Sequence, residues 1–164
     1  MKVLKNLFGI ILIVVLMAGC SHEEENRPLV VPSEYGELPQ TISENGTHVD
    51  ITITGLPDKS SNTKLNLEIH NMGSSRIEHG VGYALEKFEQ GTWYVVPFKQ
   101  DTTFVDIGLT LKPGDSFLEI VDLKDYDDQF FQGEYRIRKS VFVDNQEHVL
   151  AAKLPSSFLK EKKR

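Results

Sequence analysis

Apolar and polar residues alternate with a period of two through much of the chain after residue 47. In the segments "VDITIT" and "LNLEIH" the apolar positions are Val49, Ile51 and Ile53, and then Leu65, Leu67 and Ile69. Successive side chains of an extended strand point to opposite faces of a sheet, so each segment places one apolar face toward a core. The pattern predicts two half-buried β-strands.

Two further segments combine this alternation with a central turn. The segment "GVGYALEKFEQGTWYVVPF" (80–98) predicts a hairpin that turns at 89–91, and "IGLTLKPGDSFLEIVDL" (107–123) predicts a second hairpin around its Pro-Gly pair. Pro97 has no amide hydrogen to donate to a sheet. The returning strand of the first hairpin is therefore expected to end there or to lie at a sheet edge.

The last two predicted strands are "GEYRIRKSVFV" (133–143) and "HVLAAKL" (148–154), and nothing between the strands shows a helical period beyond one turn at 124–130. Seven or eight short strands over about 110 residues predict an all-β fold, an antiparallel sandwich of two sheets. A barrel is the alternative. The sandwich is expected to span 47–155 and to be followed by a basic tail, 156–164.

The N-terminal part has a different pattern. Lys2 and Lys5 precede an apolar run, 7–19, that contains no charged side chain. A positively charged start followed by a short apolar stretch is typical of a secretory signal, whereas a transmembrane helix needs about 20 apolar residues. We therefore expect 1–19 to be a signal peptide, with an uncleaved short membrane helix as the alternative.

The residues at the end of this run resemble the signal of bacterial lipoproteins. Ala18 and Gly19 are the small residues that precede the acylated cysteine in that signal, and Cys20 takes the place of the cysteine. Met17 departs from the pattern, because Leu is usual there and Leu16 lies one place early. The resemblance implies cleavage before Cys20 and acylation of Cys20 with palmitate-type chains, and two or more chains hold a protein stably on a membrane. A cleaved signal without lipid is the alternative.

Cys20 is the single cysteine of the chain, so the folded part is expected to contain no disulfide. The residues after it, "SHEEENRPLVVPSEYGELPQ", contain three prolines and a run of glutamates, a composition that favours extended and solvated chain. We therefore predict a lipidated start and flexible tether over 20–46. Within the tether, 29–31 is the stretch that could dock on the domain as an edge strand.

The charge of the chain bears on its partners. The formal net charge is −6, and loss of Lys2 and Lys5 with the signal leaves 16 basic against 24 acidic residues, or −8. Nucleic-acid binding depends on clustered Lys and Arg that contact phosphates. An acidic surface of this kind excludes nucleic acid as a partner.

Two aromatic positions stand out within the predicted sandwich. Tyr135 lies two residues after Gly133 at the start of a strand, the spacing of a tyrosine corner, in which the phenol bonds back to nearby backbone. Trp93 is either a large buried aromatic of the core or, with Tyr94, a contact for a partner, because tryptophan serves both purposes.

Three separated motifs, "GTWYVVPF", "LKPGDS" and "GEYRIRKS", resemble in order and spacing a bacterial immunoglobulin-like domain family of Gram-positive lipoproteins and membrane proteins. The resemblance covers 49–154. It implies an extracytoplasmic immunoglobulin-like sandwich with no catalytic residues to carry over. The paired cysteines of antibody domains are missing, which leaves the pairing of individual strands open.

The sequence shows no pattern for catalysis or for a cofactor. It lacks a G-x-S-x-G nucleophile turn, an H-E-x-x-H zinc site and a phosphate-binding glycine loop. His48, His70, His79 and His148 are scattered singly and are expected at the surface. The acidic segment 122–128 is either a solvated loop or a site for a cation such as Ca²⁺, which prefers clustered carboxylates. We predict no enzyme, no metal and no cofactor.

These observations together predict a lipoprotein that is anchored in the cell membrane and displays its domain on the extracytoplasmic face. Its expected role is to bind a protein or an envelope polymer through a sheet edge or the loops at one end. An inhibitor of an envelope enzyme and a sensor of a small ligand are the alternatives.

Overall fold

Ten β-strands form the framework of the computed structural model, which describes residues 31–54, 64–99, 105, 107–126 and 133–155. They are β1 (Thr41–Glu44), β2 (Thr47–Thr54), β3 (Lys64–Asn71), β4 (Ile77–Gly80), β5 (Ala84–Glu89), β6 (Thr92–Val95), β7 (Gly108–Leu111), β8 (Ser116–Asp122), β9 (Glu134–Val143) and β10 (Gln146–Lys153). A single 3₁₀ turn, η2 (Leu123–Asp125), follows β8. The described part of the chain contains more strands than the seven or eight expected, because β1 and β4 were not foreseen as separate strands.

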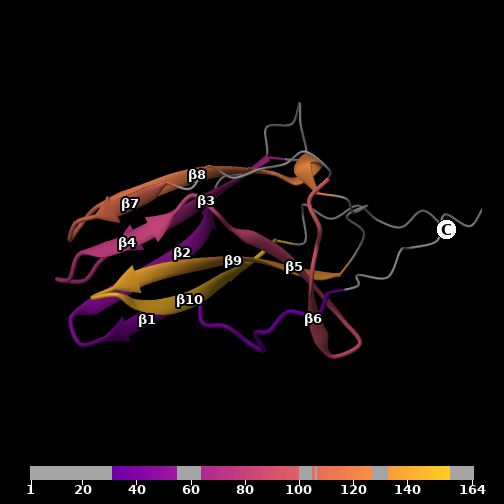
Figure 1. Ribbon diagram of the computed structural model, residues 1–164, viewed down its shortest axis with the longest axis horizontal. Helices are drawn as coiled ribbons and strands as arrows, with labels where there is room; N and C mark the ends of the chain where they lie inside the picture. Colours follow the sequence, from indigo (N-terminus) through magenta and orange to yellow (C-terminus); the bar gives the residue numbers. More distant parts are fainter. Residues whose placement is uncertain (1–30, 55–63, 100–104, 106, 127–132, 156–164) are drawn as a thin grey trace, which may run out of the picture.

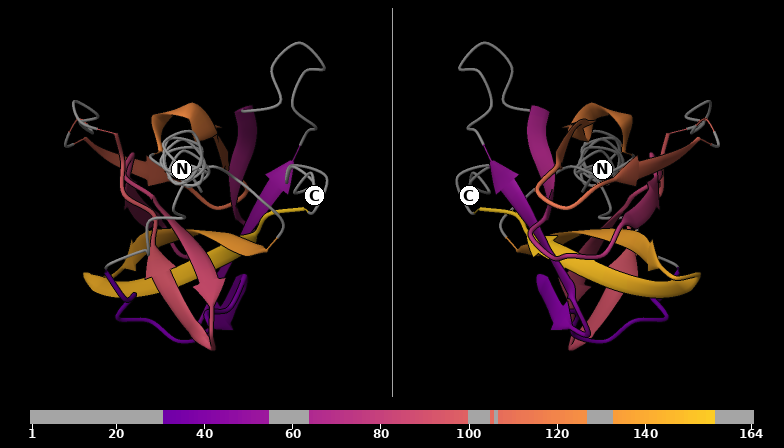
Figure 2. Two further views of the ribbon diagram at one scale, coloured as in Figure 1. Left: turned by 90° about the vertical axis from the view of Figure 1, so that its right-hand side faces the viewer. Right: turned by 90° about the vertical axis from the view of Figure 1, so that its left-hand side faces the viewer.

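The strands form two antiparallel sheets. Four strands in the order β1-β2-β3-β8 make the first sheet, and six strands make the second, in the order β6-β5-β9-β4-β7 with β10 on the other side of β9. In Figures 1 and 2 the orange strand β8 lies above the yellow pair β9 and β10. The prediction of an all-β antiparallel sandwich is confirmed, and the barrel alternative is wrong because the sheets stay separate.

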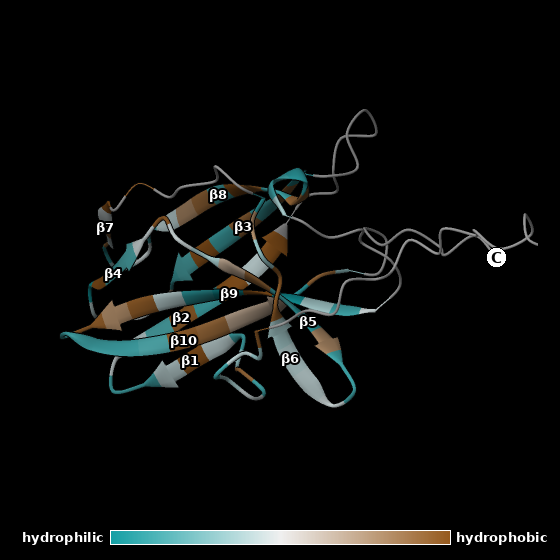
Figure 3. Ribbon diagram, turned by 45° about the vertical axis from the view of Figure 1, so that its right-hand side comes forward, coloured by the Kyte–Doolittle hydropathy of each residue, from teal (hydrophilic) through white to brown (hydrophobic). Residues whose placement is uncertain are grey.

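The core lies between the two sheets and is built from alternate strand positions. Hydrophobic and hydrophilic residues alternate along β3 and β9 in Figure 3. The apolar positions predicted from the sequence face inward: Val49, Ile51, Leu65, Leu67 and Ile69 are buried, and Ile53 packs against them while partly buried. The inward side chains of β9 and β10, among them Ile137, Val141 and Leu150, close the core from the other sheet.

A break divides the strand that faces β9 into β4 and β5. His79 pairs with Val141 and Ala84 pairs with Arg138, so β9 advances three residues where the opposite strand advances five. The two extra residues lie in 80–83, which bulge out of the ladder as in a β-bulge. As a result β4 pairs onward with β7 while β5 pairs onward with β6, and these outer strands lie toward opposite ends of the sheet in Figure 1.

The part of the predicted tether that the structure describes, 31–46, belongs to the fold. Its last residues form β1, which pairs with β2 through a tight turn in which Asn45 and Gly46 both have positive φ. Asn-Gly is the preferred pair for this type of hairpin turn. The prediction of a solvated tether is therefore wrong for 31–46, where composition was overridden by docking on the sheets. The predicted signal peptide, 1–19, and the predicted basic tail, 156–164, lie outside the described residues.

A buried ion pair joins the two sheets across the core. The alternation of β9 points Lys139 into the sandwich, and its Nζ is 2.5 Å from Oε2 of Glu119 on β8. Burial lowers the pKa of Lys139 and raises the pKa of Glu119, and in both cases the pairing works in the opposite direction. Burial thus disfavours the charged form of both groups, and each charge depends on the other for compensation.

This balance predicts that Lys139→Met alone destabilises the protein by about 3 kcal/mol, because it leaves Glu119 without its partner. The double variant Lys139→Met with Glu119→Leu should recover most of that loss, since no buried charge remains. Urea unfolding followed by tryptophan fluorescence measures both. Lys153→Met is the control, because Lys153 and Glu134 form an exposed pair whose loss costs less than about 1 kcal/mol. Equal unfolding midpoints for Lys139→Met and this control would contradict the prediction.

Candidate functional site

A segment before β1, residues 31–40, crosses the outer face of the six-stranded sheet, and we call it the strap. At its start the amide of Val95 donates to the carbonyl of Val31 at 2.9 Å, and the amide of Ser33 donates to the carbonyl of Trp93 at 2.8 Å. Near its end the amide of Ala151 donates to the carbonyl of Pro39 at 2.9 Å. The strap thus extends from the edge of β6 across β5 and β9 to the edge of β10.

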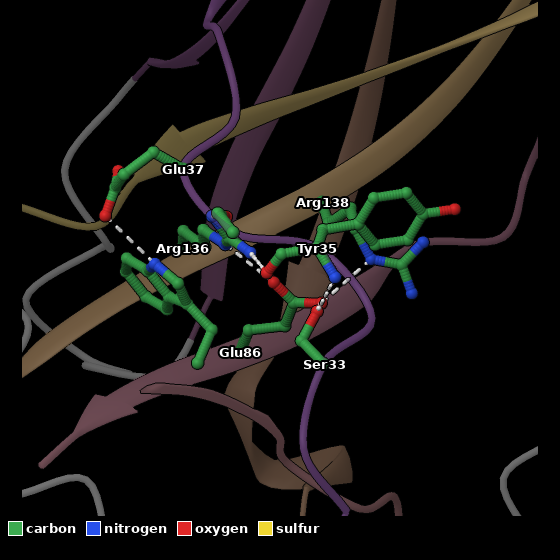
Figure 4. Close-up of polar contacts among 8 residues, drawn as sticks. Ser33, Tyr35, Glu37, Glu86, Arg136 and Arg138 are labelled. Carbon is green, nitrogen blue, oxygen red and sulfur yellow. Dashed lines mark hydrogen bonds and ion pairs between the residues drawn. The ribbon is translucent and has the colours of Figure 1, made fainter. Parts of the chain in front are cut away.

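A buried carboxylate lies beneath the strap. The side chain of Glu86 is fully buried, and its Oε2 accepts a hydrogen bond from Nε of Arg136 at 2.6 Å. Its Oε1 accepts from Nε of Arg138 at 2.9 Å and from Oγ of Ser33 at 2.7 Å, as Figure 4 shows. A buried charge is tolerated when it is paired and hydrogen-bonded. Two cations and a strap hydroxyl meet this condition for Glu86.

The two arginines extend this contact to the strap. Nη1 of Arg136 donates to the carbonyl of Gly36 at 2.6 Å and Nη2 donates to the carbonyl of Tyr35 at 3.1 Å. The guanidinium of Arg138 lies over the ring of Tyr35, 4.7 Å from its centroid. Arg136 is 1% exposed, so contacts with Glu86 and with the strap carbonyls replace the water around its guanidinium. We call Glu86, Arg136 and Arg138 the ionic clasp.

The structure places Trp93 under the strap. Trp93 is 3% exposed, its Nε1 donates to Oε1 of Glu37 at 3.1 Å, and Arg136 stacks 4.1 Å from its ring centroid. It lies on the outer face of the sheet rather than between the sheets. The prediction of a partner contact is thus wrong for Trp93, because the chain itself covers the ring. Tyr94 is half-buried and forms a β-bridge with Pro32.

The predicted tyrosine corner lies at the start of β9. Tyr135 is buried and faces the core, and its carbonyl accepts from the amide of Leu154 at 2.8 Å. Gly133 is exposed and immediately precedes the strand. The phenol bond to upstream backbone that defines the corner stays a prediction.

The other predicted sites are described in part or not at all. Cys20 lies outside the described residues, as do residues 127–128 of the acidic segment. Asp122 accepts from the amide of Lys124 at 3.1 Å and so caps η2. Among the described residues no three His, Cys, Asp or Glu side chains gather closely enough to hold a metal ion. The same part of the chain contains no helix with the length and apolarity to cross a membrane.

His79 is the exception among the histidines that were expected at the surface. It is 2% exposed because the alternation of β4 turns it inward, where its ring packs 4.7 Å from that of Phe117. Nδ1 lies 3.0 Å from the carbonyl of Gly80, and Nε2 has no hydrogen-bond partner among the described residues. Burial lowers the pKa of His79, and the charge of Lys139 lowers it further, against the opposing contact with Gly80.

A second candidate surface is the edge of the four-stranded sheet at β8, where the described residues supply no further strand beyond β3. Leu118 and Ile120 point outward from this strand and are 53% and 62% exposed. Val105 and Ile107, which are also exposed, come just before β7 at the edge of the other sheet. These four make up more than half of the seven exposed large apolar side chains of the described residues. Apolar side chains gathered at an open strand edge are typical of an interaction surface.

The ionic clasp predicts that Glu86→Gln loosens the strap, because the buried guanidinium of Arg136 and the half-buried one of Arg138 lose their counter-charge. We expect a loss of about 3 kcal/mol in the free energy of unfolding and a longer-wavelength emission from Trp93, the sole tryptophan. A protease that cuts after glutamate should cleave faster at Glu34 and Glu37. Glu134→Gln, at an exposed glutamate, is the control. Unchanged emission and cleavage in Glu86→Gln would show that the clasp does not hold the strap.

The burial of His79 predicts a loss of stability in acid. Since folding lowers its pKa from the usual value of about 6.5, the unfolded chain binds the proton first as pH falls. Stability from this group is therefore complete above about pH 6.5 and decreases below it, by at most about 1.4 kcal/mol per pH unit. Urea midpoints between pH 7.5 and 5 should fall less in His79→Leu than in the natural protein. Equal slopes in the two proteins would refute this assignment, and His70→Gln serves as a half-buried control.

Comparisons with known proteins identify the family of this chain. No curated protein shows significant similarity to the chain. The archaellum periplasmic stator protein FlaG from Sulfolobus acidocaldarius aligns over 65% of this chain and 99% of its own, with 14% identity and a TM-score of 0.38. The FlaF and FlaG stator complex from the same organism contains a chain that aligns over 74% and 99%, again with 14% identity and a TM-score of 0.38. The family described as bacterial Ig-like domain matches residues 45–155, more than half of the sequence. The chain therefore belongs to the bacterial Ig-like domain family.

Proposed function

We propose that this protein is a lipoprotein anchored through Cys20 on the extracytoplasmic face of the cell membrane, where its Ig-like domain is a non-catalytic binding module for a protein or an envelope polymer. The observation that carries the binding role is the open β8 edge with its exposed Leu118 and Ile120. Strand edges offer unpaired backbone groups, and alternate side chains beside them provide specificity. The lipoprotein signal at 18–20 supports the anchor.

The buried charges of the domain support a structural rather than a catalytic use. Glu86 is neutralised by two arginines on the outer face, and Lys139 is paired with Glu119 between the sheets. A catalytic site needs titratable groups that converge on a space where a substrate can enter. The open depression lined by 43–48 and 72–74 contains only Glu44 and His48 as titratable side chains. No observation favours an enzyme inhibitor or a small-ligand sensor over a binding module.

The strap changes the reach of the anchored domain. Because the strap is fastened from Val31 onward, about ten residues separate it from Cys20, where the sequence predicted a tether of more than twenty. Fully extended, ten residues span at most about 36 Å, against about 72 to 90 Å for twenty to twenty-five residues. The proposed anchor therefore holds the domain close to the bilayer, and the chain enters it at the β6 edge.

Lipidation predicts that radiolabelled palmitate is incorporated into the natural protein and that the label is lost in Cys20→Ser, because the thiol is the acylated group. The natural protein should also sediment with membranes after cell fractionation. Ser21→Ala, one residue away, is the matched control and should keep the label. An unmodified Cys20 thiol in the mass spectrum of the native protein, or equal labelling of Cys20→Ser, would disprove the anchor.

A further inference from the structure

We propose that the partner at the β8 edge is a second copy of this chain, and that two β8 strands pair antiparallel about a two-fold axis. This inference rests on the proposed function, because it takes the β8 edge as the binding surface and the membrane as the place where copies meet. Pairing of this kind joins two four-stranded sheets into one continuous sheet. A two-fold contact uses the same surface on both copies, so it closes at a dimer.

The other strand edges are short or covered by the chain itself. The strap pairs with the edge of β6, and the carbonyl of Pro39 accepts a hydrogen bond from the amide of Ala151 at the edge of β10. The edge strands β1 and β7 have four residues each. β8 has seven residues, and among the described residues it pairs with β3 alone. In the part of the chain that the structure describes, β8 is therefore the longest edge strand without a backbone hydrogen bond to a segment outside its sheet, and it also carries two exposed aliphatic side chains.

The sequence of β8, "SFLEIVD", is self-complementary when it pairs with itself around Glu119. In that register Leu118 of one copy lies opposite Ile120 of the other, and the two-fold axis repeats the contact. Ser116 lies opposite Asp122, so no like charges meet at the ends. Opposite side chains in antiparallel strands lie about 4.5–5.5 Å apart and stabilise the pairing when both are apolar. The two outward aliphatic pairs would thus bury one another.

Glu119 is the residue that could prevent this contact, because the two copies of it would be opposite each other. Inward-pointing charges on edge strands commonly protect against edge-to-edge association. Here Lys139 of the same chain compensates the charge, with its Nζ 2.5 Å from the carboxylate. Each copy therefore brings a neutral pair to the axis, and the usual protection is weakened.

The size of the contact indicates where it forms. Stable interfaces use about 20–30 residues from each side, whereas β8 supplies seven residues and its neighbours a few more. A contact of this size is weak between molecules that diffuse in solution. Attachment to one membrane raises the effective concentration of the partners without any new contact, so the full-length lipidated protein is the form that should pair.

The test uses two double variants with opposite charges at the facing positions. One copy carries Leu118→Lys with Ile120→Lys and one tag, and the other carries Leu118→Glu with Ile120→Glu and a second tag. Both are expressed as full-length proteins in the same cells, crosslinked in intact membranes and isolated through one tag. Natural copies should capture each other. Lys with Lys and Glu with Glu should lose capture at least about tenfold, a change of about 1.4 kcal/mol, and the mixed pair should recover it.

Control variants separate pairing from folding. Thr52→Lys changes the outer face of β2 in the same sheet, away from the edge, and should leave capture unchanged. All variants should keep the Trp93 emission and urea midpoint of the natural protein. The inference is overturned if natural copies do not capture each other, or if the mixed pair fails to recover. If natural copies instead capture a different envelope protein that both charge variants lose, the second copy is excluded while the proposed function stands. Palmitate labelling reports on the anchor independently.

Discussion

The contact between Glu86 and two arginines is the interaction on which the outer face of this domain depends. A fully buried carboxylate needs compensation, and it receives this from Arg136, Arg138 and a hydroxyl of the strap. Arg136 also links Glu86 to the strap, because its Nη1 and Nη2 donate to strap carbonyls while its guanidinium lies over the ring of Trp93. The path of the strap over β5 and β9 and the cover over the tryptophan therefore depend on one charge on β5.

β9 connects this outer contact to the interior. Its alternation sends Arg136 and Arg138 outward to Glu86 and sends Lys139 inward to Glu119, so one strand carries ionic pairs on both faces of the sheet. The inward pair lies beside the edge strand β8, and it is this pair that leaves the edge without an uncompensated charge. The chemistry of the core therefore bears on what the surface can bind.

The sequence predicted the half of the fold that depends on local periodicity. The positions of Val49, Ile51 and Leu67 in the core follow from alternation alone, and the family was apparent from three short motifs. The strap was missed because its contacts with the six-stranded sheet join residues 53 to 112 positions apart. Its prolines and glutamates also have the composition of solvated chain. One local signal was present, the Asn45–Gly46 pair, which is typical of a hairpin turn. His79 was misplaced because β4 was not recognised as a strand, and the burial of Glu86 could not be read from a polar position next to a turn.

The strap also determines where a recombinant fragment of this domain has to begin. The family match begins at residue 45, and a fragment cut at that boundary would lack both the strap and β1. Without the strap, Arg136, Arg138 and the ring of Trp93 would be exposed to solvent. Glu86 would also lose the hydrogen bond from Ser33 and would no longer be covered. Such a fragment would bind acidic peptides nonspecifically through the exposed arginines, and this binding would say nothing about the natural partner. Binding assays on a soluble version should therefore start at or before Val31.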